Sequence, residues 1–316
     1  MIFLGIDAGG TKTTAVAADI KGEMIRSAKG PPGAISVIGV NGVKSLITDL
    51  LKELDLNDSL DRIQAATFGF SGVGRTDVSE KVEEEIKKIG FTDFKLITDG
   101  ELLHYSAFKE SDGILLEAGT GAVCISGKNN VLTQIGGWGY LLGDEGGGYQ
   151  IGRDAVRKAL AENDKNLPVS ELSKEIMKFY GVEKREELIS TVYSSDNVQK
   201  VISSSAFTVC DLAKQGDSDA QTIVEAAATH LFTILQTALE KYAADDLIKI
   251  AYAGSILGKD SPVLDLLNKK LDNIGSDFEI IDIPIEPAAA GVLYAVIGSG
   301  EESSEQLLNS LKGIIV

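Results

Sequence analysis

The sequence is poor in residues that build disulfide frameworks and metal clusters. Its 316 residues include two cysteines, Cys124 and Cys210, and no CxxC pair. Two thiols so far apart cannot form a disulfide framework, and they are too few for a four-thiolate metal site. We therefore predict two buried thiols in a protein of the reducing cytoplasm.

Long uncharged apolar runs and positive charge are also scarce. No stretch reaches the roughly 18 apolar residues of a membrane span, and the apolar start at residues 2–4 ends at Gly5 and Asp7 without a basic segment before it. We expect a chain that is neither exported nor embedded in a membrane. Asp plus Glu number 47 against 30 Lys plus Arg, a net charge of −17. This negative field repels polyanions, so we expect neither nucleic acid nor an anionic membrane as a partner.

What the sequence does contain is enough apolar residues, 44%, for a large core. The length exceeds the roughly 100 to 200 residues of one domain, which favours two. The first apolar runs predict an antiparallel three-strand meander, and later periodicity predicts α/β units. The expected strands are 2–7, 14–19, 23–28, 63–70, 94–98, 122–126 and 248–253, and the expected helices are 43–54, 78–89, 101–108, 262–271 and 287–297.

One pattern occurs twice. Residues 4–11 form an apolar strand followed by an acid, a small residue and a Gly/Thr turn, and residues 115–121 repeat that order. We interpret this as a duplicated α/β domain with a cleft between the copies; the alternative is a chance likeness of two glycine-rich turns. The expected boundaries are 1–112, joined by 303–316, and 113–302, with a helical insert at about 170–242.

The segment Asp7–Thr13 is the first candidate binding site. Glycines in a tight turn let backbone N–H groups approach phosphate oxygens. The threonine hydroxyls and the lysine of this segment can add further donors. Asp7 could hold Mg²⁺ through water. The predicted phosphate-binding residues are Gly9, Gly10, Thr11, Lys12 and Thr13. The alternative is an ordinary hairpin with an exposed lysine. Neither GxxxxGK[ST] nor GxGxxG is present, which disfavours P-loop and Rossmann sites.

Four motifs together carry a family resemblance: the turns at 7–13 and 117–122, residues 253–255, and 286–291. The chain resembles the actin, hexokinase and Hsp70 ATPase superfamily, and within it the branch of N-acetylglucosamine kinases and BadF/BadG/BcrA/BcrD ATPases. The most specific match is residues 136–146, GGWGYLLGDEG. The resemblance implies two ribonuclease-H-like lobes, ATP and Mg²⁺ as cofactors, a small sugar as substrate and a homodimer. It adds Gly119, Thr120, Gly121, Gly254 and Ser255 to the nucleotide site.

The resemblance also implies that Asp99 is the catalytic base. An acid at the carboxyl end of a strand lies where open α/β sheets contact ligands, and it can accept the proton of an attacking sugar hydroxyl. The alternative role for an aspartate there is the N-cap of the next helix.

On the acceptor side, the resemblance places the sugar against Gly137, Trp138, Asp144 and Glu145. Trp138 is the sole tryptophan, and its ring can lie along the apolar face of a sugar; a tryptophan packed in the core is the alternative. Glu145 either binds the sugar or braces the loop. We expect the two histidines, His104 and His230, to be packed or surface residues and not catalysts.

The sequence departs from the amino-sugar kinases at two places. No Asn follows the third strand in Gly30–Ser36, and Ala122 stands where Ser is common. N-acetylglucosamine, glucosamine, glucose and an acidic keto sugar therefore all remain candidate acceptors. An activator ATPase is the main alternative function, although its shared iron–sulfur cluster needs two suitably placed cysteines. A sugar-sensing repressor is disfavoured by the charge and by the lack of a DNA-binding segment before Ile2, and a noncatalytic sugar-binding protein would not need two phosphate turns.

Overall fold

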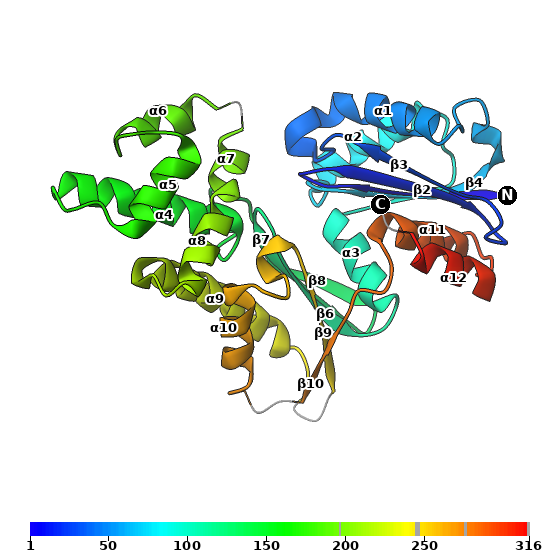
Figure 1. The fold of residues 1–316 in the computed structure, drawn as a ribbon. Coiled ribbons are helices and arrows are strands. Elements are labelled where there is room, and N and C mark those ends of the chain that lie inside the picture. Colours follow the sequence, from blue (N-terminus) through cyan, green and yellow to red (C-terminus); the bar gives the residue numbers. More distant parts are fainter. Residues whose placement is uncertain (196, 244–246, 275–276, 315–316) are drawn as a thin grey trace. The chain divides into compact units, whose positions relative to one another are not determined.

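The computed structural model divides the chain into two compact units. Unit 1 comprises residues 1–111 and 282–316, and unit 2 comprises residues 112–281. The structure describes the chain except for residues 196, 244–246, 275–276 and 315–316. Residue 196 of the predicted insert and 315–316 of the predicted C-terminal segment therefore lie outside the described residues. Each unit is built on one five-stranded sheet (Figure 1).

The sheet of unit 1 has the strand order β3-β2-β1-β4-β5. Its strands are β1 (Ile2–Ala8), β2 (Thr13–Asp19), β3 (Ile25–Gly30), β4 (Ile63–Phe70) and β5 (Phe94–Ile97). The pairs β1–β2 and β2–β3 are antiparallel, whereas β1–β4 and β4–β5 are parallel. The predicted meander followed by α/β units is confirmed.

Helices cover both faces of this sheet. On one face, α1 (Ile35–Glu53) and α2 (Thr76–Lys87) pack against Leu4 and Ile6, with the short helix η1 (Leu60–Arg62) before β4. On the other face, α3 (Asp99–Phe108), α11 (Pro287–Gly298) and α12 (Glu305–Lys312) lie against Phe3 and Val16 (Figure 1). The helix expected at 43–54 begins earlier, but Gly39, at φ 63°, interrupts it, so the uninterrupted part starts near the expected residue.

The placement of α11 corrects the expected boundary, which assigned residues 282–302 to the second domain. These residues belong to unit 1. The reason is a close packing of small residues: a Cβ on Gly5 would collide with the carbonyl oxygen of Ala288, and one on Gly291 would lie 3.0 Å from the Cα of Gly5. Only a helix that starts with small residues can approach β1 so closely, so Ala288 and Gly291 direct the chain back to the first sheet.

Unit 2 repeats the topology of unit 1. Its strands are β6 (Gly113–Ala118), β7 (Ala122–Lys128), β8 (Val131–Gly136), β9 (Ile248–Ala253) and β10 (Phe278–Ile281). Their order is β10-β9-β6-β7-β8. The first three strands pair antiparallel, and β9 pairs parallel with β6 and β10. Strand by strand this is the arrangement of unit 1, so the duplication predicted from the two turns is confirmed.

The helices of unit 2 pack on one face of that sheet around a single core. They are α4 (Gly148–Asp164), α5 (Glu171–Tyr180), α6 (Glu187–Tyr193), α7 (Val198–Ser204), α8 (Ala206–Lys214), α9 (Ser218–Leu239) and α10 (Pro262–Leu271), with η2 (Ser255–Leu257) after β9. Helices α5 to α9 form the predicted insert. Helices α4 and α12 and strands β8 and β10 were not predicted.

Helix α9 is long and apolar enough to span a membrane by length and composition alone. One face of it is instead part of the core of unit 2, through Ala227, Ala228, Leu231 and Leu235. The exposed face carries threonines whose hydroxyls bond to carbonyls one turn earlier, for example Thr229 to Glu225 and Thr233 to Thr229.

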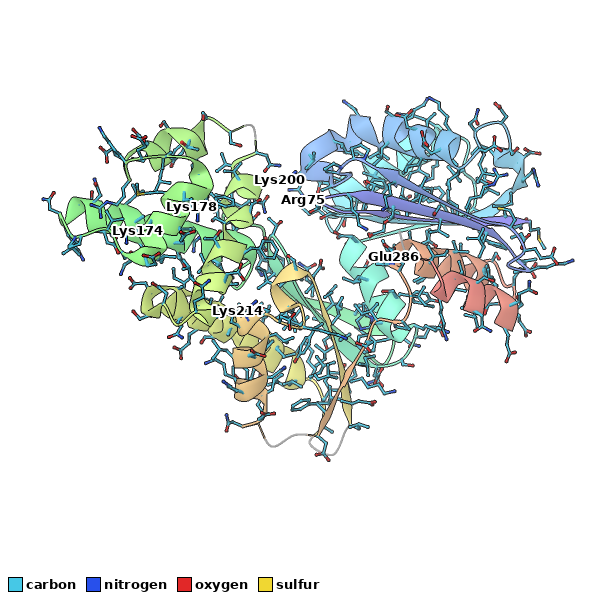
Figure 2. All side chains as sticks on the ribbon, viewed as in Figure 1. Arg75, Lys174, Lys178, Lys200, Lys214 and Glu286 are labelled. Carbon is cyan, nitrogen blue, oxygen red and sulfur yellow. The ribbon has the colours of Figure 1, made fainter. Side chains whose placement is uncertain are left out.

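The exposed faces of the insert helices are charged. Lys174 and Lys178 on α5 each pair with a glutamate one turn earlier, at 3.0 and 2.9 Å (Figure 2). Such solvated pairs contribute at most about 1 kcal/mol, so the insert depends on its buried side for stability.

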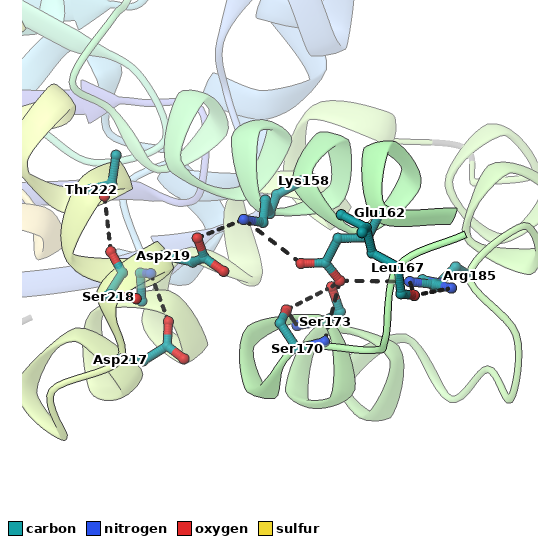
Figure 3. A network of polar contacts seen from close by, with 11 residues as sticks. Lys158, Glu162, Leu167, Ser170, Ser173, Arg185, Asp217, Ser218, Asp219 and Thr222 are labelled. Atoms are coloured by element: carbon teal, nitrogen blue, oxygen red, sulfur yellow. Dashed lines mark hydrogen bonds and ion pairs between the residues drawn. The ribbon is translucent and has the colours of Figure 1, made fainter. Parts of the chain in front are cut away.

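A buried polar network joins α4, α5 and α9 (Figure 3). Its centre is Glu162, which is 5% exposed and accepts hydrogen bonds from the Ser173 hydroxyl (2.7 Å) and the Ser170 N–H (3.2 Å). Lys158 lies 3.7 Å from Glu162 and 2.6 Å from Asp219, and Arg185 lies 3.6 Å from Glu162. Burial alone would raise the pKa of Glu162, but the two serines and Lys158 outweigh it, and the pKa is lowered. The network therefore holds a charged carboxylate of α4 against the insert.

Candidate active site

The turn between β1 and β2 lies at the surface of unit 1. The N–H of Gly9 donates to the carbonyl of Lys12 (3.1 Å), and the carbonyl of Gly9 accepts from Gly33 (3.0 Å) and Ala34 (3.1 Å). A Cβ on Gly10 would meet nothing within 4 Å, and the φ angle of Gly10 is not positive. Neither packing nor the backbone requires glycine there. What the glycine provides is access to the backbone from outside, as a phosphate site needs.

The two threonines of the turn have different environments. Thr11 is exposed, so its hydroxyl is accessible to a ligand. Thr13 is fully buried, and its hydroxyl donates to the carbonyl of Pro31 at 2.7 Å. The predicted hydroxyl donation from Thr13 to a phosphate is therefore corrected: Thr13 opens β2 opposite Gly30, so its side chain holds the turn after β3 instead.

Lys12 lies beside the start of α11. Its ammonium is 3.7 Å from Glu286, and the lysine side chain is 52% exposed. Glu286 is the N-cap of α11, where its other oxygen accepts from the N–H of Ala288 at 3.2 Å (Figure 2). Separating an exposed pair of this kind costs at most about 1 kcal/mol, so Lys12 can reorient toward an anionic ligand at small cost.

Asp7 is half-buried at the carboxyl end of β1, directly opposite Thr14 on β2. The hydroxyl of Thr14 is buried and has no hydrogen-bond partner among the described residues. A half-buried carboxylate at a strand end suits a hydrated Mg²⁺ ion, because this ion prefers carboxylate and water oxygens. Within the described residues, no group of three His, Cys, Asp or Glu could hold a metal. Asp7 therefore fits an ion held by one carboxylate through water.

Asp99 occupies the first turn of α3, half-buried. It is not the cap of that helix. Thr98 is the N-cap, in a capping box in which its hydroxyl accepts from the N–H of Glu101 (3.1 Å) and its N–H donates to the Glu101 carboxylate (2.8 Å). The capping explanation for Asp99 is thereby excluded, and its carboxylate remains available for another role.

The surroundings of Asp99 raise its pKa. Burial raises the pKa of the carboxyl, while the hydroxyl of Ser71 and the N–H of Gly100 (3.0 Å) oppose the shift. A raised pKa makes a carboxylate a better proton acceptor near neutral pH. Ser71 also donates its backbone N–H to the carbonyl of Ala8 (3.0 Å). Ser71 thus connects the carboxylate to the strand end that leads into the Gly9–Lys12 turn.

The corresponding turn of unit 2, residues 118–121, is enclosed by backbone from two other segments. The N–H groups of Gly148 and Tyr149, at the start of α4, donate to the carbonyls of Gly119 (2.8 Å) and Thr120 (2.9 Å). A Cβ on Gly254 would collide with the carbonyl of Ala118, so the Gly254–Ser255 turn lies directly against this one. The structure therefore brings together the predicted nucleotide-binding residues of unit 2.

Trp138 projects from the loop between β8 and α4. Its side chain is 66% exposed, which excludes the core-packing alternative. Leu141 and Leu142 of the same loop are exposed as well. An apolar surface of this kind marks a binding site more often than a structural element.

Asp144 joins this loop to the 118–121 turn. Its Oδ1 accepts from the N–H of Gly139 at 3.0 Å. Its Oδ2 lies so close to Gly121 that a Cβ there would collide with it. Burial raises the pKa of Asp144 and Glu145 adds to the shift, while the Gly139 hydrogen bond opposes it. Its remaining lone pairs can accept hydrogen bonds from hydroxyl groups. Asp144 thus braces the loop and remains a candidate ligand-binding group.

Glu145 pairs with Arg153 on α4 at 3.3 Å. Of the two roles considered for it, the structure favours bracing the loop. Arg153 also contacts Asp154 (3.3 Å) and lies over the ring of Tyr149.

The two histidines lie on α3 and α9, and the two cysteines lie on β7 and α8. His104 is buried against Phe108, and His230 is exposed on α9, as predicted. Cys124 and Cys210 are both buried in the core of unit 2. Burial raises the pKa of both thiols, that of Cys210 to about 11. Neither thiol is suited to ligate a cluster at the protein surface.

Three features of the candidate site were not predicted: Ser71, the pairing of Glu286 with Lys12, and the α4 residues that contact the Trp138 loop. Ser71 directly follows β4, so the rule that polar residues at strand ends contact ligands could have identified it. The other contacts depend on tertiary packing and had no local signal.

Residues 4–297 match the BadF/BadG/BcrA/BcrD ATPase family, and the chain belongs to that family. Two curated relatives are each 27% identical to it. One is the N-acetylmuramic acid/N-acetylglucosamine kinase of Clostridium acetobutylicum, aligned over 92% of this chain and 97% of its own length. The other is the N-acetyl-D-glucosamine kinase of Dictyostelium discoideum, aligned over 93% and 98%.

Solved structures show the same fold. A Chromobacterium violaceum protein, provisionally named an N-acetylglucosamine kinase, superimposes with a TM-score of 0.76 at 21% identity, covering 92% of this chain and 98% of its own. A ROK family glucokinase of Streptomyces griseus, solved with glucose and AMPPNP, gives a TM-score of 0.55 at 15% identity and covers 93% and 99%. The fold is therefore the duplicated α/β fold of actin-like ATPases and sugar kinases.

Proposed function

We propose that the protein is an ATP-dependent sugar kinase that transfers the γ-phosphoryl group to a hydroxyl of a hexose or amino sugar. The observation that carries this proposal is the environment of Asp99. Its carboxylate is not used to cap α3, its pKa is raised, and Ser71 connects it to the strand that leads into the Gly9–Lys12 turn. A base held at fixed distance from a phosphate-binding turn is what phosphoryl transfer to a hydroxyl requires.

In the proposed mechanism, unit 1 offers the backbone N–H groups of the 9–12 turn and the side chains of Thr11 and Lys12 to phosphate oxygens. Unit 2 offers the N–H groups of the 119–121 turn and the hydroxyl of Ser255. Mg²⁺ would neutralise phosphate charge, and Asp7 would hold it through water. Asp99 accepts the proton of the attacking hydroxyl. Most of the rate enhancement comes from alignment and from neutralisation of phosphate charge, since phosphoryl transfer needs little covalent chemistry from the protein.

For the acceptor we propose N-acetylglucosamine first, because both curated relatives are named for it. Trp138 would stack on the apolar face of the ring, Asp144 would accept from its hydroxyls, and Gly137 would allow close approach of the backbone. The absence of Asn from residues 30–36 leaves glucose, glucosamine and acidic sugars as competitors. N-acetylmuramic acid joins them because of the Clostridium relative.

A coupled ADP-release assay over these sugars tests the proposal. We expect one of them, with N-acetylglucosamine first, to stimulate ADP release well above the rate with ATP and Mg²⁺ alone. Hydrolysis that no sugar stimulates would contradict the kinase function and favour the activator ATPase, against which the two buried cysteines argue.

We further propose a cytoplasmic homodimer. Light scattering of the purified protein tests the dimer, since a mass near 33.5 kDa at micromolar concentration would contradict it.

A further inference from the structure

The loop that carries Trp138 and Asp144 depends on a residue of α4 outside the predicted site. Gln150 is 3% exposed, in the first turn of α4. Its Oε1 accepts from the N–H of Gly146 at 2.8 Å, and its Nε2 donates to Asp154 Oδ2 at 2.7 Å. Both ends of the amide are therefore used inside the protein.

These bonds close a ring of contacts around the end of the loop. Asp154 also accepts from Arg153 (3.3 Å), and Arg153 pairs with Glu145 (3.3 Å). Two consecutive loop residues, Glu145 and Gly146, are thus anchored to α4, one through its side chain and one through its backbone.

The residue that directly precedes this ring is Asp144. Asp144 has φ 60° and Gly146 has φ 95°, so the chain reverses locally on both sides of Glu145. A left-handed aspartate is held only where its surroundings fix it. A Cβ on Gly146 would lie 2.6 Å from Leu231, so the core fixes Gly146 from one side and Gln150 from the other.

We infer that Gln150 is a positioning residue for the sugar acceptor: through the N–H of Gly146 it sets the direction of the Asp144 carboxylate and orders the loop of Trp138. This inference rests on the proposed sugar kinase function. An amide serves both partners at any pH, because the N–H of Gly146 needs an acceptor and the carboxylate of Asp154 needs a donor.

The test uses Gln150→Met, which keeps the volume but removes both hydrogen bonds. We expect the sugar KM to rise about tenfold, as for one lost buried hydrogen bond, while the KM for ATP stays within about twofold. Lys158→Met is the matched control, because it breaks a polar network of the same unit away from the loop. It should lower the Tm without moving the sugar KM.

Trp138 supplies a readout that does not depend on activity, because it is the sole tryptophan. Its fluorescence anisotropy should fall in Gln150→Met and stay unchanged in Lys158→Met. If the wild type proves to have no sugar-dependent turnover, the kinase proposal fails, yet the anisotropy still tests whether Gln150 orders the loop.

Gln150→Glu tests the donor half and covers the case in which Gln150→Met does not fold. A glutamate keeps an acceptor for the N–H of Gly146, but its carboxylate faces the carboxylate of Asp154. The sugar KM of this variant should therefore return toward the wild-type value as the pH falls, because the new carboxyl is then protonated and becomes a donor. Any one of three results would overturn the inference. In Gln150→Met, these are an unchanged anisotropy of Trp138 or equal rises in the KM values for sugar and ATP. In Gln150→Glu, it is a sugar KM that does not depend on pH.

Discussion

Units 1 and 2 share one strand topology and differ in what surrounds it. In unit 1, the turn after β1 lies beside a half-buried carboxylate, Asp99, whose position is fixed by the neighbouring strand end. In unit 2, the equivalent turn after β6 is enclosed by the start of α4 and by Gly254, and an exposed loop with Trp138 lies next to it. Both units thus carry a glycine-rich turn at the same point of the topology. In the proposed function, unit 1 adds the base, Asp99, and unit 2 adds the acceptor loop with Trp138 and a helical insert.

If this division is correct, changes in unit 1 should affect the transfer step and changes in unit 2 should affect acceptor binding or the stability of the insert. The largest effect is expected for Asp99→Asn. Removal of the base should lower kcat by about 10² to 10⁴, with nucleotide affinity retained in isothermal titration. Near-normal turnover would exclude Asp99 as the base.

Thr98→Ala is the matched control for that variant. It removes the cap of α3 and should cost about 1 kcal/mol of unfolding free energy, while kcat falls far less than in Asp99→Asn.

The pH profile of the wild type is a second check on the role of Asp99. Since burial raises the pKa of Asp99, kcat/KM of the wild type should fall on the acid side at a pH above the ordinary aspartate value of about 3.9. This acid limb should disappear in Asp99→Asn.

The second-largest effect concerns the insert of unit 2. Glu162→Ala leaves Arg185 and Lys158 without their buried partner and should cost about 3 kcal/mol in denaturant unfolding. Because the folded pKa of Glu162 is lowered, its contribution is present above its unfolded pKa of about 4.3 and is lost as the pH falls through the folded value. The Tm of the wild type should therefore fall more in acid than the Tm of Glu162→Gln. The same acid dependence of Tm in both proteins would contradict this role of Glu162.

The smallest of these effects should be the most selective. Trp138→Ala removes an exposed ring and should leave Tm nearly unchanged, but should raise the sugar KM about tenfold, as expected for a lost stacking contact of about 1.4 kcal/mol. The KM for ATP should not change. Val131→Ala, which truncates an exposed apolar residue of β8, is the control and should change neither constant. Equal shifts of both KM values in Trp138→Ala would assign the ring to packing.

Much of this architecture could be predicted from local sequence. Apolar runs located β1, β4 and β9 almost to the residue, and the repeated turn revealed the duplication, because both signals lie within short segments. Strands β8 and β10 were missed because β8 is an edge strand and largely exposed, while β10 has only four residues. Helix α11 was predicted but assigned to the wrong unit, since its docking depends on the contact between Gly5 and Gly291.

The candidate site depends on local patterns and on tertiary contacts in the same way. Glycine-rich turns and an acid at a strand end are local patterns, and they indicated Asp7, the Gly9–Lys12 turn and Asp99. The burial of Thr13, the pairing of Glu145 with Arg153 and the role of Gln150 depend on which segments meet in the folded chain. A single sequence does not show which segments come into contact.

The most direct test of the central claim is ³¹P NMR of the protein with ATP, Mg²⁺ and N-acetylglucosamine. The sugar kinase account predicts a new phosphomonoester signal that grows in step with ADP, and a free-phosphate signal that stays small. Release of inorganic phosphate in step with ADP, with no phosphomonoester from this or any other sugar of the screen, would contradict it.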